Sequence, residues 1–136
     1  MLAPGTRIDD RYEIIDMVGA GGMGQVYRAR RLRLGDEVAI KVMPAAHTAP
    51  DSRERFLRES RACAQLRHPN IVGLLDFDFD AANQPYMVME LLSGPSLREE
   101  IELESPMSPA HVADILAPVA AALQLAHDRR ITHRDP

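Results

Sequence analysis

Three glycines, at positions 19, 21 and 24, form the pattern G-x-G-x-x-G-x-V with Val26. Glycine tolerates positive φ and has no Cβ, so the backbone N–H groups beside it can approach an anion closely. The flanking stretches, residues 12–18 and 26–30, are rich in β-branched and apolar residues, which favours a hairpin with the glycines at its tip. A polyphosphate is therefore a candidate ligand, and an ordinary glycine-containing hairpin is the alternative.

The residues after the glycines separate three classes of phosphate-binding loop. A Walker loop requires Lys-Ser or Lys-Thr after its last glycine, but Gly24 is followed by Gln25. A dinucleotide fold requires a helix after the loop and an acidic residue about 20 positions later, whereas residues 26–29 begin like a strand and position 44 is Pro44. The third class is followed by a strand of sequence V-A-I-K, which residues 38–41 match.

With this strand the sequence resembles a protein kinase, and the resemblance covers nearly the whole chain from Tyr12 to Asp135. The motifs Gly-Ala-Gly-Gly-Met-Gly, Arg-Phe-Leu-Arg-Glu and His-Pro-Asn-Ile-Val are most similar to those of bacterial, Hanks-type serine/threonine kinases. The resemblance implies transfer of the γ-phosphoryl group of Mg-ATP to a protein hydroxyl, with ATP and Mg²⁺ as cofactors. It implies a nucleotide site formed by Val18, Gly19, Ala20, Gly21, Gly22, Met23, Gly24, Val26, Ala39, Lys41, Met89, Glu90 and Leu92.

Two charged residues have paired roles in this resemblance. Lys41 would hold the α- and β-phosphates, and Glu59 would be the counter-ion that fixes the lysine. One alternative is Glu54, which lies in the first turn of its helix, where an acid chiefly favours the helix dipole. The other alternative is that Glu59 is an ordinary surface charge. Glu59 shares a helix face with Phe56 and Cys63, so we expect that face to pack inward.

The adenine ring is expected beneath Val26 and Ala39, because adenine sites are mostly apolar with a few aimed polar groups. By resemblance, Met89 gates the back pocket, while the carbonyl of Glu90 and the N–H of Leu92 bind the adenine edge. An ordinary strand that ends in a Ser-Gly turn is the alternative interpretation of this segment.

The last residues resemble the start of a catalytic loop, His-Arg-Asp, in which Asp135 would accept the proton of the substrate hydroxyl. Pro136 stands where the family usually has leucine, isoleucine or valine. The catalytic-loop asparagine and the D-F-G motif, which hold magnesium in the family, do not occur in these 136 residues, so no metal ligand is assigned. We therefore expect the isolated chain to be inactive, with a non-catalytic nucleotide- or partner-binding regulatory module as the alternative function.

Apolar alternation predicts five strands and an inserted helix that position these residues. The predicted strands span residues 11–18, 25–31, 37–42, 71–78 and 85–91, and the predicted helix spans residues 51–66. Ser96 with Glu99 forms a capping box for a short helix, and Ser108-Pro109 begins a longer one. The predicted fold class is α+β, a kinase-like small lobe with hinge at residues 8–92, followed by the first helices of an incomplete large lobe at residues 93–136.

Composition limits the partners and the location. A net charge of −4 and a pI near 5.7 argue against nucleic acid or an anionic membrane as the partner. The single cysteine, Cys63, fits a reducing compartment, and no signal peptide is evident. The apolar run at residues 115–126 is interrupted by Pro118 and Gln124 and is short for a membrane span. We expect a cytoplasmic chain that binds ATP and a protein substrate and that self-associates through the apolar helix at residues 108–130.

Overall fold

The computed structural model describes residues 1–21, 24–44 and 50–132. The chain divides into two compact units. The first consists of Met1–Gln65 and Val72–Leu91 and contains the sheet, and the second consists of Leu66–Ile71 and the residues from Leu92 onward. Gly22, Met23 and Asp135, three of the predicted site residues, lie outside the described residues.

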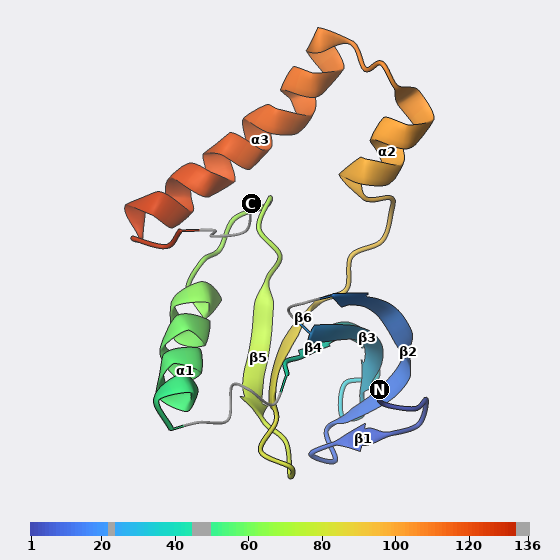
Figure 1. Cartoon of the computed structure of the whole chain (residues 1–136), viewed down its shortest axis with the longest axis vertical. Coiled ribbons are helices and arrows are strands. Elements are labelled where there is room, and N and C mark those ends of the chain that lie inside the picture. The colour runs from blue at the N-terminus through green and yellow to red at the C-terminus, as the bar shows by residue number, and fades with distance from the viewer. Residues whose placement is uncertain (22–23, 45–49, 133–136) are drawn as a thin grey trace. The chain divides into compact units, whose positions relative to one another are not determined.

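The first unit contains a curled antiparallel sheet, which confirms the predicted small-lobe fold class (Figure 1). Its strands, in the order β1-β2-β3-β4-β6-β5, are β1 (Arg7–Ile8), β2 (Tyr12–Gly21), β3 (Gly24–Arg31), β4 (Glu37–Val42), β6 (Pro85–Glu90) and β5 (Leu74–Phe79). The sheet has six strands rather than the predicted five, because β1 pairs with β2 through two residues, too few to show an alternating pattern. Strand β5 begins at Leu74, whereas the sequence predicted that this strand begins at residue 71.

One face of the sheet is fully packed. Tyr27, Ile40 and Val88 are each 0% exposed and stand opposite one another on β3, β4 and β6. Since side chains alternate between the faces of a strand, the residues two positions away share this face. The resulting core consists of Ile8, Tyr12, Ile14, Tyr27, Ala29, Val38, Ile40, Val42, Tyr86 and Val88.

Polar side chains connect the beginning of β2 to the far end of the sheet. Tyr12 donates a hydrogen bond of 2.7 Å to Asp76 Oδ2 on β5, and Arg11 donates to the same oxygen at 2.9 Å. Tyr86, on β6, accepts from Arg11 at 2.7 Å and donates to Asp9 Oδ2 at 2.6 Å. Because β2 and β5 are separated by three strands in the sheet order, these contacts form only when the sheet curls as Figure 1 shows.

Helix α1 (Pro50–Ala64) ends two residues before the predicted boundary and lies along β5 (Figure 1). Phe56 packs edge-to-face against two rings of β5, with centroid distances of 6.3 Å to Phe77 and 5.2 Å to Phe79. Packing among these three aromatic rings attaches the helix to this strand.

The second unit contains helices α2 (Leu97–Glu104) and α3 (Pro109–Asp128). Ser96 and Glu99 form the predicted capping box, and Ser108 caps α3 with Pro109 at its first position. Within the described residues, α3 is the helix whose length and apolar composition would suffice to cross a membrane, although the interrupted run had suggested otherwise. Length and composition do not distinguish such a helix from one inside a folded domain.

Candidate functional site

Several of the predicted nucleotide-binding residues of the first unit share one face of the sheet, opposite the packed core. Gly19, Val26 and Lys41 stand in one row across β2, β3 and β4. The same row continues through Met87 on β6 to Phe77 on β5. Ala39 pairs with Met89 two positions along the strands, so both lie on the same face as Lys41. The strand register thus brings together residues that the sequence placed in separate motifs.

This face is less closely packed than the core face. Ala39 is 8% exposed, whereas Val26, Lys41 and Met89 are half-buried. The face therefore combines half-buried apolar side chains with the Lys41 ammonium, a combination suited to an aromatic ring that carries an anionic tail.

The two outer glycines of the motif have different local environments. Gly19 has open space where a Cβ would point, so nothing in the described structure occupies that direction. Gly24 has φ of +121°, and a Cβ there would overlap the carbonyl oxygen of Val42 on β4. Gly24 is therefore required by the close approach of two strands, in addition to any role toward a ligand. Gly21 pairs with Gly24, while Val18 and Ala20 complete the strand before the tip.

Glu59 is not brought to Lys41 in this structure. Its side chain is exposed, and the ion pairs among the described residues do not include one between Glu59 and Lys41. The expectation that the Glu59 side of α1 packs inward is wrong for this structure, because Phe56 and Ser60 form the buried stripe. Burial, and secondarily the charge of Glu59, raise the pKa of the Cys63 thiol. The role of Glu59 stays a prediction.

Two hydrogen bonds, here called the polar clasp, join Gly73 to Glu90 at the end of β6, the segment that is predicted to bind adenine. The Glu90 carboxylate accepts a hydrogen bond of 2.8 Å from the Gly73 N–H, and the Glu90 N–H donates to the Gly73 carbonyl at 3.1 Å. Sequence reasoning missed this clasp, because a glycine and a glutamate 17 positions apart form no recognisable motif. Leu92 lies in the second unit, so its predicted partnership with Glu90 is untested.

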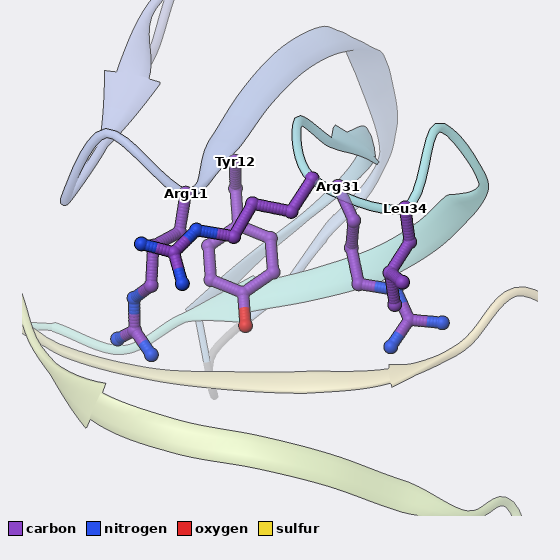
Figure 2. Close-up of a pocket in the computed structure, with 5 residues that line it drawn as sticks. Arg11, Tyr12, Arg31 and Leu34 are labelled. Atoms are coloured by element: carbon purple, nitrogen blue, oxygen red, sulfur yellow. The ribbon is translucent and has the colours of Figure 1, made fainter.

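A pocket of about 320 Å³ lies at the beginning of β2, whereas the glycine motif lies at the end of that strand. It is lined by Arg11, Tyr12, Arg31, Arg33 and Leu34, and Figure 2 shows the Tyr12 ring between the arginine side chains. Arg31 forms an ion pair with Asp36, which lowers the pKa of that carboxyl. Burial and the hydrogen bond to Asp76 raise the pKa of Tyr12 to about 12. The pocket shares no residue with the predicted nucleotide site.

Comparisons with known proteins agree with the motifs. The family model "Protein kinase domain" matches residues 12–135. The chain is 41% identical over 132 residues to the probable serine/threonine-protein kinase PknB of Corynebacterium glutamicum, covering 94% of this chain and 20% of that protein. It is 39% identical over 134 residues to the serine/threonine-protein kinase PknB of Mycobacterium tuberculosis, covering 96% of this chain and 21% of that protein.

Solved structures show the same similarity. The crystal structure of the Mycobacterium tuberculosis PknI kinase domain aligns with a TM-score of 0.85 at 31% identity, over 100% of this chain and 55% of that chain. Complete coverage includes α3, which therefore corresponds to part of a folded domain in that structure. The chain spans about a fifth of the length of the curated relatives it matches.

Proposed function

We propose a function from one premise: the chain belongs to the protein kinase domain family, and its relatives are serine/threonine kinases. In this proposal the chain contributes the nucleotide-binding part of a serine/threonine protein kinase. The reaction transfers the γ-phosphoryl group of ATP to a protein hydroxyl. The observation that carries the proposal is the shared sheet face of Gly19, Val26, Ala39, Lys41 and Met89.

In the proposed mechanism, this chain binds and orients the nucleotide. The adenine ring packs on Val26 and Ala39, and the Lys41 ammonium neutralises charge on the α- and β-phosphates. Open space beside Gly19 leaves room for the phosphates to approach the backbone N–H groups. Mg²⁺, when bound, would neutralise further phosphate charge. Asp135 would accept the proton of the substrate hydroxyl, and Glu59 would steady Lys41 once the two side chains meet.

The chain offers a specific test of nucleotide binding, because Lys41 is its single lysine. An ATP analogue with a reactive acyl phosphate acylates an amine held beside the phosphates. We expect mass spectrometry to find the label on Lys41 and excess ATP to suppress it. The amino-terminal amine is the internal control, whose labelling should be insensitive to ATP. Lys41 labelling that ATP leaves unchanged would contradict the proposal.

Phosphoryl transfer is tested separately, in a chimaera that joins this chain to the remaining part of the PknI kinase domain. We expect radiolabel transfer from the chimaera, loss of transfer in Asp135→Asn, and no transfer by the 136-residue chain alone. The exposed position of Glu59 favours a second candidate, a non-catalytic nucleotide-binding module. ATP binding with no transfer by the chimaera would support that second candidate.

We also propose that the second unit self-associates. Its helices expose large apolar side chains at Leu97, Ile101, Leu103, Val112, Leu116 and Val119. Fully burying such a side chain gains roughly 1.5–3 kcal/mol relative to full exposure, and these side chains are only partly covered, so a second copy that covers several of them is favoured. Light scattering of the chain should show a dimer or larger species that reverts toward monomer in Leu116→Glu/Val119→Glu. A monomeric wild-type chain would contradict self-association.

A cytoplasmic location completes the proposal, since ATP is available there and reducing conditions suit the free thiol of Cys63. In intact cells, the chain should resist an externally added protease and lose that protection only on lysis.

A further inference from the structure

The beginning of α1 is fastened to β5 by a cation and two aromatic rings. The guanidinium carbon of Arg53 lies 3.7 Å from the centroid of the Phe79 ring. Arg53 also donates a hydrogen bond to the side-chain oxygen of Asn83, between β5 and β6. Phe56, one turn further along α1, packs edge-to-face on Phe79. A cation over a ring face and an edge-to-face ring pair are both attractive, so these contacts set the rotation of α1 about its own axis.

Arg53 and Glu59 lie on opposite flanks of the buried stripe of α1. Successive residues of an α-helix are roughly 100° apart, which places Arg53 and Glu59 roughly 120° apart with Phe56 and Ser60 between them. Phe56 and Ser60 are buried, whereas Glu59 is exposed. A roll of the helix that turns Glu59 toward the sheet therefore carries Arg53 away from Phe79.

Ser60 indicates that the observed rotation has a cost. Its side chain is 0% exposed, and its hydroxyl oxygen has no hydrogen-bond partner within the described structure. A buried hydroxyl without a partner is unfavourable relative to one that reaches water. The roll that turns Glu59 inward moves Ser60 out of the buried stripe, so the same motion relieves this cost.

Lys41 lies on the sheet face that α1 covers at β5. Lys41 shares its row with Phe77, which contacts Phe56. The strand order β4-β6-β5 puts two strand spacings, about 10 Å, between the Lys41 backbone and β5. A glutamate rolled inward on α1 is therefore directed along this face toward the lysine.

We propose that Arg53 is a positioning residue for Glu59. Its stack on Phe79 competes with the Lys41–Glu59 ion pair, so Arg53 sets the fraction of molecules in which Glu59 reaches Lys41. The consequence for nucleotide binding rests on the proposed function, whereas the competition itself depends only on α1 and the sheet.

The test again uses the single lysine, in the 136-residue chain without nucleotide. A carbodiimide joins a carboxylate to an amine that it contacts, so the yield of the Lys41–Glu59 amide measures the inward position of Glu59. We expect Arg53→Ala to raise this yield about two- to fivefold, the ratio that corresponds to a surface cation–π contact. Ser60→Ala removes the unpartnered hydroxyl and should lower the yield. Arg58→Ala is the matched control, because Arg58 is exposed and makes the same charge change on the opposite side of α1.

An unchanged or lower yield in Arg53→Ala would overturn the proposal, provided that circular dichroism shows the fold intact. If that variant does not fold, Phe79→Leu carries the same prediction, because it removes the ring face and keeps an apolar side chain. ATP affinity, measured in parallel, separates this inference from the proposed function. A higher cross-link yield without ATP binding contradicts the kinase function alone, and ATP binding with an unchanged yield contradicts the role of Arg53 alone.

Discussion

The two faces of the small-lobe sheet are built from the same strands but packed differently. On one face, Tyr27, Ile40 and Val88 are completely buried. On the other, the neighbouring residues Val26, Lys41 and Met89 are half-buried. The difference arises within single strands, since one step along β4 leads from the core residue Ile40 to Lys41. The burial of a side chain in these strands therefore depends on which face of the sheet it lies on, and adjacent residues can differ completely.

This contrast separates residues that hold the sheet from residues available to a ligand. A side chain that touches protein on all sides contributes to stability through burial and close packing. A half-buried apolar side chain beside a single amine retains surface for another molecule. Substitutions on the two faces should therefore affect different measurements.

The largest expected effect is on the core face. Ile40→Ala should lower the free energy of unfolding by about 2–5 kcal/mol, through lost burial and the cavity left behind. Met89→Ala, on the other face, should cost less than half as much, because part of that side chain already contacts water. Urea denaturation of both variants measures the difference. Equal losses of unfolding free energy in the two variants would show that the two faces are packed alike and would contradict this prediction.

The second largest effect is expected from a substitution on the opposite face, at Lys41, and it concerns kcat rather than stability. In the chimaera with the PknI remainder, Lys41→Met should lower kcat at least tenfold, about 1.4 kcal/mol of transition-state stabilisation. Methionine retains most of the apolar stem, so the free energy of unfolding should change by no more than about 0.5 kcal/mol. Glu59→Gln should act in the same direction and more weakly, since the lysine charge remains. Steady-state kinetics that show less than a threefold loss for Lys41→Met would remove that residue from the site.

The smallest effect concerns the polar edge of the core face. The folded chain holds the phenolic proton of Tyr12 more tightly than the unfolded chain does, because burial and Asp76 raise its pKa to about 12. Its contribution to stability is therefore complete below pH about 10 and is lost as the pH rises toward 12. Tyr12→Phe should cost about 1 kcal/mol at neutral pH and make the alkaline decline shallower. An identical alkaline decline in Tyr12→Phe would exclude Tyr12 as its source. Tyr86, whose pKa is also raised, should retain part of the decline.

Local signals predicted most of the fold. Ser96 with Glu99 and Ser108 with Pro109 begin their helices as their spacing indicated. The alternation in residues 37–42 predicted the strand that carries Lys41. Strand β1 escaped prediction because two residues show no period.

The site was less predictable, because its geometry depends on the rotation of one helix. Helical spacing placed Glu59 about 60° from Phe56, at the border of the buried stripe, so a small roll decides whether it is inside or outside. The contacts that fix the roll come from Phe79 and Asn83, which are distant from α1 in sequence. Such side-chain packing between elements leaves no periodic signal.

The network that joins Arg11 and Tyr12 to Asp76 and Tyr86 has a consequence for the order of folding. Its hydrogen bonds connect residues 64 to 75 positions apart, so the beginning of β2 cannot obtain its partners until β5 and β6 exist. Contacts between such distant residues require closing a long loop and slow the folding of a domain. During synthesis, the β2–β3–β4 part of the sheet emerges first, and the curl closes late. The early intermediate has β4 as an exposed edge strand, the position where pairing with another chain is most probable.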